Sequence, residues 1–320
     1  MMGLREFLVA GVLAVNAFVS AHVVDNGTTI TTSLRYNVTT ANLLEKRMEH
    51  SSIHCALPDH PDIIAVTRTL GNDGWAQSYD RPCSSGNWCP YACASGKLMN
   101  QWNPASVAYV HPDMEQGGLY CGEDGIAHIP FPDRDFCVEA PAKLATRNLL
   151  DNHVMICQTV LPGDEGMRIP NRIEPGQSLG LGVPDSHYWA GTSASLYINY
   201  PGVEVDDACV WGNNTFRAGN WAPYTLGLSM REDGEIFANL GWNPIWLEPT
   251  TPFRNEVPPF GARIICEGVG CHDTPCEINP ANGVNQVIAG SNGLIGVGGA
   301  AACIVTAPQT AELRMELFYN

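Results

Sequence analysis

Short stretches rich in β-branched and aromatic residues alternate with turn signals along most of the chain. The turn signals are Pro-Gly, Asn-Gly, Asp-Gly and Asn-Asn pairs, which favour chain reversals. The stretches between them have the length and composition of strands. They read HVMICQTV (153–160), SLYINYPGVEV (195–205), EIFANLGW (235–242), ARIIC (262–266) and ACIVTA (302–307).

The final stretch, ELRMELFY, has the clearest strand pattern. Leu313, Met315 and Leu317 alternate with charged residues, so a strand would place all three on one face. No stretch shows the apolar spacing of a long helix, and no internal repeat occurs. We therefore predict one all-β domain at 75–320, a disulfide-stapled β-sandwich with long turn-rich loops, preceded by a polar segment at 48–74.

Composition narrows the class of protein. The 320 residues include 17 basic and 33 acidic side chains, a net charge of −16, which excludes nucleic acid as a partner. An apolar content of 45% excludes a disordered chain. Twelve cysteines, an even and high number, indicate an oxidising compartment.

The first 21 residues have the features of a secretory signal peptide. Arg5 precedes an apolar run at 7–20, and Val19-Ser20-Ala21 forms a small-residue cleavage site after Ala21. The dibasic pair Lys46-Arg47 would end a propeptide at 22–47. No later stretch is apolar enough to cross a membrane, so we expect a secreted product without a membrane anchor.

Three sequons are candidate N-glycan acceptors in a secreted protein. They are Asn26-Gly27-Thr28, Asn37-Val38-Thr39 and Asn213-Asn214-Thr215. Cleavage after Arg47 would remove the first two, so only Asn213 would remain in the mature chain.

The cysteines form two clusters. Zinc is the competing explanation, but neither cluster contains a Cys-x2-Cys pair and the compartment is oxidising. Disulfides are therefore favoured, and the pairing stays open. No nucleotide or metal motif occurs elsewhere, so we expect no metal and no cofactor. The clustered cysteines are Cys83, Cys89, Cys93, Cys121, Cys266, Cys271 and Cys276.

Tryptophans in polar, turn-rich segments are candidates for stacking on sugar rings, although a single tryptophan is more often a core residue. The candidate stacking residues are Trp88, Trp102, Trp189, Trp242 and Trp246. Glycoside hydrolysis requires two carboxylates across the scissile bond. The candidate catalytic acids near these aromatic segments are Asp80, Glu165, Asp185, Asp207 and Glu248.

Several motifs resemble those of the fungal SUN family of cell-wall proteins, in order from about Trp75 to the C-terminus. They include WCPYAC (88–93), GGLYC (117–121), CQTVLPGDEGM (157–167), VPDSHYW (183–189) and LGWNPIWLEPTTPFRN (240–255). The resemblance implies a secreted β-glucosidase-like protein that acts on cell-wall β-1,3-glucan in wall remodelling, septation and cell separation. It places the protein outside the cell, at the wall or the cell surface.

The chain departs from the family pattern in one respect. Members often carry a long Ser/Thr-rich segment before the domain, whereas only 48–74 separates the dibasic pair from the domain here. Free secretion is therefore more strongly favoured here than in a typical member of the family. A thaumatin-like sandwich with an acidic cleft would suit the chain by analogy.

Our leading hypothesis is a glycosidase in which Asp80 and Glu165 are the first choices for the carboxylate pair. A structural ion pair between Asp80 and Arg81 is the competing explanation for the first of them. The alternative function is a non-catalytic β-glucan-binding cell-wall protein.

Overall fold

The structure, a computed structural model, describes residues 53–67, 69–107, 116–164, 166–291 and 293–319, and a separate hairpin near the N-terminus. The hairpin consists of β1 (Val19–Asp25) and β2 (Thr28–Leu34), paired antiparallel, and Ala21 lies in β1. It belongs to a unit at Met1–Ser51, while Ser52–Asn320 forms a second unit. Asn26, Asn37, Lys46 and Arg47 lie outside the described residues.

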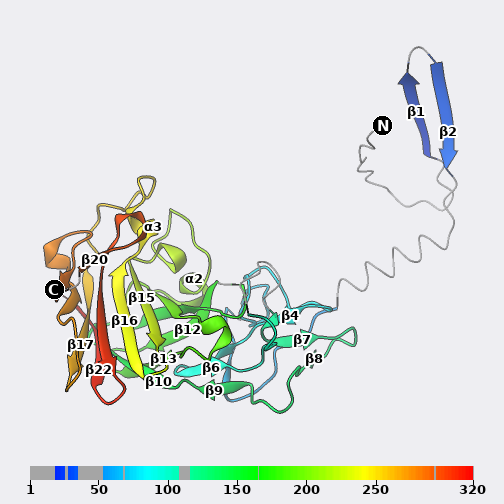
Figure 1. The fold of residues 1–320 in the computed structure, drawn as a ribbon. Coiled ribbons are helices and arrows are strands. Elements are labelled where there is room, and N and C mark those ends of the chain that lie inside the picture. The colour runs from blue at the N-terminus through cyan, green and yellow to red at the C-terminus, as the bar shows by residue number, and fades with distance from the viewer. Residues whose placement is uncertain are drawn as a thin grey trace. The chain divides into compact units, whose positions relative to one another are not determined.

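The larger unit contains a six-stranded sheet (Figure 1). All neighbouring strands are antiparallel except β10 and β22, which run parallel. In spatial order the strands are β13 (Ser178–Val183), β10 (Ala142–Asn148), β22 (Glu312–Tyr319), β17 (Phe260–Glu267), β18 (Cys276–Ile278) and β19 (Ile288–Ala289).

A seven-stranded, fully antiparallel sheet forms the second layer. In spatial order its strands are β12 (Met167–Ile173), β11 (Val154–Thr159), β14 (Ala194–Ile198), β15 (Tyr224–Met230), β16 (Glu235–Trp242), β21 (Ala301–Pro308) and β20 (Gly293–Ile295).

The main core lies between these two sheets and confirms the predicted all-β sandwich. In β22 the alternating residues Leu313, Met315 and Leu317 are all buried in it, as the sequence pattern predicts. Leu226 and Leu228 of β15 pack into the same core from the other sheet. Each sheet thus buries the apolar face that the period-2 pattern of its strands creates.

Strand β11 is buried on both faces over 154–157, which explains the apolar run at these four positions. Val154 and Ile156 pack into the inter-sheet core, while Met155 and Cys157 face a different cluster that includes Val66 and residues 76 and 92. A second set of segments therefore covers the outer face of the seven-stranded sheet.

These segments form a cysteine-rich lobe, described at 53–67, 69–107 and 116–140, beside β12 (Figure 1). The lobe has small antiparallel sheets and its own core around Trp75 and Tyr91. Its strands are β3 (Ile63–Ile64), β4 (Trp88–Cys89), β5 (Ala92–Cys93), β6 (Lys97–Met99), β7 (Leu119–Cys121), β8 (Ala127–His128) and β9 (Cys137–Glu139).

The helices of the described residues are single turns. They are α2 (Val205–Ala208), α3 (Pro244–Leu247) and the 3-10 turns η2 (Trp189–Gly191), η3 (Gly219–Trp221), η4 (Pro280–Asn282) and η5 (Val297–Gly299). None of these helices has the length and apolarity required to cross a membrane.

The predicted strand at 195–205 is wrong in its second half. β14 ends at Ile198, and a turn follows in which the Val203 N–H donates to the carbonyl of Tyr200. Pro201 and Gly202 lie within this turn, and their combination favours reversal over continued pairing. Helix α2 then begins at Val205.

All twelve cysteines are joined in six disulfides. Three staple the lobe, one joins β11 to the residue after α2, and Cys276–Cys303 connects the two sheets of the sandwich. The bonds are Cys55–Cys121, Cys83–Cys89, Cys93–Cys137, Cys157–Cys209, Cys266–Cys271 and Cys276–Cys303.

Candidate functional site

A row of aromatic side chains, hereafter the aromatic row, extends from the lobe to the sandwich. Its members are Tyr120, Trp88, Phe131, Trp102 and Tyr188. The pairing of strands β4, β7 and β8 positions the first two members of the row. Trp88 pairs with Tyr120, and Tyr120 pairs with His128, so these three side chains lie on one face of the small sheet.

The rings of the row follow one another at short spacing. Trp88 lies edge-on to Tyr120, with centroids 6.1 Å apart, and stacks at 24° on Phe131 at 6.4 Å. At the other end Trp102 meets the edge of Tyr188 at 6.1 Å. Tyr120 is 40% exposed and the other four are half-buried, so the row presents aromatic surface to solvent.

Arg134 joins the two halves of the aromatic row. Its guanidinium carbon lies 5.0 Å from the Trp102 centroid and 5.1 Å from that of Phe131. The same guanidinium donates to the Trp102 carbonyl at 3.2 Å. Gln101 fixes the loop that carries Phe131, because its amide donates to the Phe131 and Arg134 carbonyls and accepts from the Phe131 N–H. These contacts hold the rings in place without a ligand.

The loop between β11 and β12, residues 160–166, contacts the sandwich end of the row. The Tyr188 hydroxyl donates to the carbonyls of Met99 and Leu161, at 3.0 and 3.1 Å. Burial raises the pKa of Tyr188, so its hydroxyl remains a donor at physiological pH. A Cβ on Gly117, which pairs with Trp102, would lie 2.6 Å from the Pro162 carbonyl, so this loop also packs directly against the lobe.

Asp164 and Arg168 face each other across this loop. The Arg168 side chain is 1% exposed and that of Asp164 10%, and Arg168 Nε lies 3.7 Å from Asp164 Oδ2. Asp164 Oδ1 accepts the Gly166 N–H at 3.0 Å. Burial lowers the pKa of Arg168, and the charges of Asp164 and Asp80 oppose that shift. Within the described residues, no nitrogen of this guanidinium has a hydrogen-bond partner.

The predicted catalytic acids are distributed over several elements. Asp80 is exposed and close enough to act electrostatically on Arg168. Asp185 is half-buried and its Oδ1 accepts the N–H groups of His187 and Tyr188, so it supports the turn before η2. Asp207 on α2 and Glu248 after α3 are exposed on separate elements. Glu165 lies outside the described residues.

Three predicted stacking residues are wrong, because they lie in the core. Trp189, Trp242 and Trp246 are 1%, 1% and 0% exposed, so no ring face is available to a sugar. Trp242 donates to the Gln286 carbonyl at 3.1 Å, and Trp246 packs on Phe253 with centroids 4.6 Å apart. Trp88 and Trp102 remain candidates because both belong to the aromatic row.

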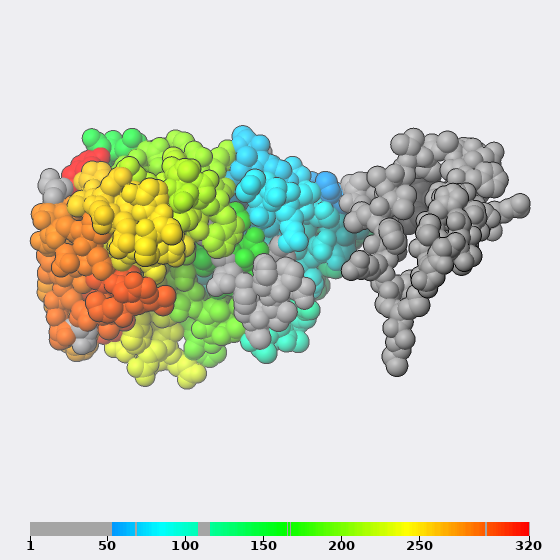
Figure 2. Space-filling model, turned by 90° about the horizontal axis from the view of Figure 1, so that it is seen from above, coloured from blue at the N-terminus to red at the C-terminus, as the bar shows by residue number. Residues whose placement is uncertain are grey.

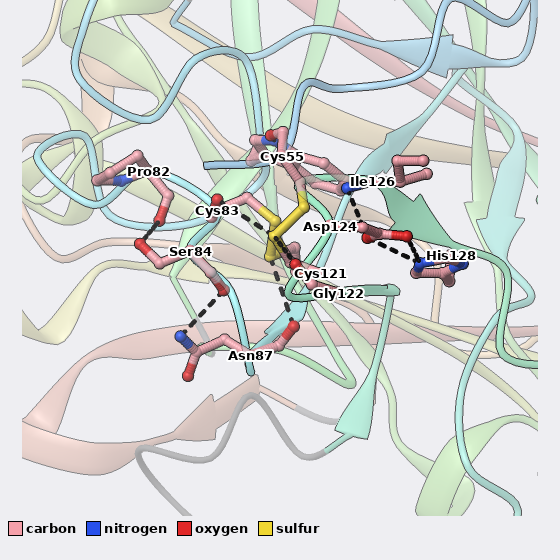
Figure 3. Close-up of a disulfide and its surroundings, with 12 residues drawn as sticks. Cys55, Pro82, Cys83, Ser84, Asn87, Cys121, Gly122, Asp124, Ile126 and His128 are labelled. Carbon is pink, nitrogen blue, oxygen red and sulfur yellow. Dashed lines mark hydrogen bonds and ion pairs between the residues drawn. A yellow bond between two sulfur atoms is a disulfide. The ribbon is translucent and has the colours of Figure 1, made fainter. Parts of the chain in front are cut away.

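Two disulfides lie next to each other in the lobe (Figure 3). The Sγ atoms of Cys55, Cys83 and Cys121 all lie within 4.8 Å of one another. Each is bonded in a disulfide, so none is a thiolate that would bind a cation.

Figure 3 also shows Asp124 accepting from the Ile126 N–H and contacting His128, interactions that lower the pKa of Asp124.

A pocket of about 540 Å³ lies near the start of the lobe, which is drawn in blue to blue-green in Figure 2. Its polar lining includes His54, Asp59, His60 and Asp73. His60 Nδ1 accepts the Asp62 N–H at 3.2 Å, and its ring packs edge-on against Phe136 at 4.9 Å. His60 is therefore part of the lobe's internal packing.

Sequence comparison identifies the family. A family model described as "Beta-glucosidase (SUN family)" matches residues 50–305, and the chain therefore belongs to the SUN family. An uncharacterized protein of Saccharomyces cerevisiae is 42% identical over 267 residues, covering 82% of this chain and 75% of that protein. This result confirms the resemblance seen in the motifs.

Two named relatives are longer than this chain. "Probable secreted beta-glucosidase adg3" of Schizosaccharomyces pombe is 42% identical, over 85% of this chain but 24% of its own length. "Probable secreted beta-glucosidase UTH1" of S. cerevisiae is 30% identical, over 74% of this chain and 62% of its own length. The chain thus spans less than two thirds of both named proteins.

Solved structures give weaker matches. The protein elicitor MoHrip2 from Magnaporthe oryzae aligns with a TM-score of 0.29 and 12% identity, over 55% of this chain and 98% of its own. The thaumatin-like xylanase inhibitor TLXI aligns with a TM-score of 0.31 and 12% identity, over 55% of this chain and 99% of its own.

Sequence reasoning missed Phe131, Arg134, Tyr188, Asp164 and Arg168. Of the acidic pair in LPGDEGM it selected Glu165, although Asp164 is the one followed four residues later by an arginine. The spacing was no signal of the ion pair, because i, i+4 residues meet on a helix and this segment is a loop that enters strand β12. Nothing in the sequence indicated that Arg134 would lie over the rings of Trp102 and Phe131.

Proposed function

We propose that the protein is a secreted glycosidase that acts on β-1,3-glucan of the cell wall. The observation that carries the proposal is the aromatic row, held in place by Arg134 and Gln101 and half-open to solvent. Sugar rings have apolar C–H faces that stack on such aromatic surface. The hydrolytic part is supported by membership of a family described as β-glucosidase.

The same proposal places the protein in wall remodelling, septation and cell separation. Its support is the predicted secretory leader together with relatives named as secreted proteins. Exposed Asn213 would carry the glycan of the mature chain, since its sequon lies on a surface loop where the Asn213 side chain accepts the Thr215 N–H. Cleavage after Ala21 and Arg47 completes the proposed maturation.

The decisive experiment incubates the secreted protein, expressed from the full chain, with laminarin-type β-1,3-oligosaccharides and separates the products by chromatography. We expect shorter oligosaccharides or glucose to accumulate in proportion to enzyme. Binding of insoluble β-1,3-glucan without any product would overturn the hydrolase and leave a binding protein. Cellulose-derived β-1,4-oligosaccharides serve as the linkage control.

A non-catalytic glucan-binding wall protein is the second candidate. It is favoured by the separation of the predicted acids, because Asp207 and Glu248 lie on separate elements and Asp185 supports a turn. A binding protein needs only the aromatic row, whereas a hydrolase also needs two carboxylates beside it. The two candidates therefore differ in whether the carboxylates next to the row are required.

A further inference from the structure

Arg168 is a buried charge whose N–H groups are incompletely hydrogen-bonded. Its side chain is 1% exposed, and within the described residues Nε and both terminal nitrogens lack hydrogen-bond partners. A buried guanidinium whose N–H groups lack hydrogen bonds is costly, and a neighbouring carboxylate offsets part of that cost. Asp164, with an oxygen 3.7 Å from Nε, is the carboxylate paired with it.

We propose that Asp164 is a catalytic carboxylate of this site and that Arg168 is its positioning residue. The inference rests on the proposed glycosidase function and deepens it. Asp164 keeps a tenth of its side chain exposed, whereas Arg168 is enclosed and acts only through Asp164.

The loop between β11 and β12 carries Asp164 and also contacts the sandwich end of the aromatic row. Leu161, three residues before it, accepts the Tyr188 hydroxyl, and Pro162 packs against Gly117 beside Trp102. Trp102 and Asp164 are therefore linked through this one loop, and the proposal places a sugar stacked on Trp102 beside it.

Backbone and side chains fix the orientation of Asp164 from two sides. The Gly166 N–H binds Oδ1 at 3.0 Å, and Arg168 lies on the Oδ2 side. A Cβ on Gly166 would lie 2.6 Å from Arg168 Nε and 2.9 Å from Asp164 Oδ1, so only glycine permits this approach. A carboxylate that stabilises charge in a transition state must be held in a fixed orientation before the reaction, and these contacts hold Asp164 in that way.

In glycoside hydrolysis, the glycosidic C–O bond breaks and positive charge develops on the sugar ring. Water is the co-reactant: its oxygen bonds to the anomeric carbon, and one of its protons ends on the leaving oxygen. In the proposal, the Asp164 carboxylate stabilises the developing positive charge.

The test compares Asp164→Asn and Asp164→Ala with the wild-type full chain on β-1,3-oligosaccharides. We expect kcat to fall about 10²–10⁴-fold in both variants, with binding to insoluble β-1,3-glucan retained. Sodium formate should restore turnover to Asp164→Ala, whose cavity admits a small carboxylate, and not to Asp164→Asn, whose amide fills the space.

Arg168 variants separate positioning from simple structural support. Arg168→Gln should lower kcat about 10²-fold with KM within about twofold, and Arg168→Lys, which keeps the charge, should recover part of that loss. The matched control is the exposed pair Arg231–Asp233 in the turn between β15 and β16. Arg231→Gln and Asp233→Asn should retain wild-type turnover.

The outcomes distinguish failure of the proposed hydrolase function from failure of the proposed role of Asp164. A wild-type protein without turnover on any β-glucan overturns the hydrolase and the role of Asp164 together. Wild-type turnover that survives in Asp164→Asn within about threefold overturns the role of Asp164 alone, as does a folded Asp164→Ala that formate does not rescue. If Asp164→Ala is not secreted, the kcat of Asp164→Glu is measured instead. A kcat equal to that of the wild type in Asp164→Glu also overturns the role of Asp164.

Discussion

Trp88 lies at the centre of the aromatic row, with the edge of Tyr120 on one side and the stacked ring of Phe131 on the other. It is half-buried, so one part of the indole supports its neighbours while another part faces solvent. Trp246 has the same side chain but is 0% exposed and packs on Phe253. Burial therefore gives the two tryptophans different roles.

Replacing Trp88 by alanine should weaken binding to insoluble β-1,3-glucan about tenfold, because it removes an aromatic face worth about 1–1.5 kcal/mol. Trp246→Ala should instead lower the free energy of unfolding by about 3–5 kcal/mol through the cavity it leaves. Pull-down on glucan particles and urea unfolding measure the two effects. Trp88→Ala with wild-type affinity would remove the aromatic row from the proposed site.

Glu316 shows how a charged residue is accommodated in the six-stranded sheet. It is 7% exposed and its Oε2 accepts from Arg263 at 3.0 and 2.8 Å, with Arg314 3.5 Å from Oε1. Burial by itself would raise the pKa of Glu316. The hydrogen bonds and charges of Arg263 and Arg314 outweigh it, so the pKa lies below its ordinary value of 4.5.

This lowered pKa predicts a pH-dependent loss of stability. Because the folded pKa is below the unfolded one, the pair's contribution is complete above pH 4.5 and disappears as pH falls through the folded pKa. Glu316→Gln should cost about 1–2 kcal/mol at pH 7. The difference from wild type should shrink as pH drops below 4.5, as urea unfolding at several pH values would show. A constant difference across that range would contradict the charge pairing.

At the scale of elements, one disulfide connects the two layers of the sandwich. Cys276 lies in β18 of one sheet and Cys303 in β21 of the other, and the bond closes a loop with a sequence separation of 27. Cys266–Cys271 closes a separation of only 5. The longer loop loses more conformational freedom in the unfolded chain when it is closed.

Removal of the Cys276–Cys303 bond should therefore lower the free energy of unfolding more than removal of the Cys266–Cys271 bond. The double variant Cys276→Ala, Cys303→Ala should lose about 3–4 kcal/mol of unfolding free energy, and Cys266→Ala, Cys271→Ala about 2 kcal/mol. Urea denaturation of both variants provides the comparison. Equal losses would mean that native-state packing around the sulfurs, and not loop entropy, sets their contribution.

Most central strands of the sandwich could be predicted from sequence because their signals are local. β22 follows its alternation of Leu313, Met315 and Leu317, and β11 its continuous apolar run. The order of strands could not be predicted, since β10 pairs in parallel with β22 from the far end of the chain. No local pattern encodes that contact.

The candidate site was less predictable than the fold because long-range packing defines it. Trp88 and Trp242 have similar aromatic, turn-rich surroundings in sequence, yet only Trp88 reaches the surface. The role of Tyr188 depends on contacts with Met99 and Leu161, which lie in two other segments. Asp80, Asp185, Asp207, Glu165 and Glu248 remain predictions as catalytic acids.

At the scale of the whole molecule, the net charge of −16 allows a neutral ligand to be distinguished from a charged one by the effect of salt on binding. β-1,3-Glucan carries no charge, so attachment to it through the aromatic row should involve stacking and hydrogen bonds and no ion pairs. Attachment to a charged wall polymer would instead depend on Coulomb interactions. Salt screens such interactions, with a Debye length of about 10 Å at 0.1 M and about 3 Å at 1 M.

Binding of the full chain to insoluble β-1,3-glucan should therefore change less than about twofold between 0.1 and 1 M sodium chloride. Stacking buries apolar surface, so high salt should leave it unchanged or strengthen it slightly. Sedimentation of the protein with glucan particles across the salt series gives the affinity, with Trp88→Ala as the matched control. A steep fall in affinity with salt would show that charged groups dominate the attachment. The ligand would then be a cationic or metal-bridged wall component instead of neutral glucan, because an acidic surface attracts cations.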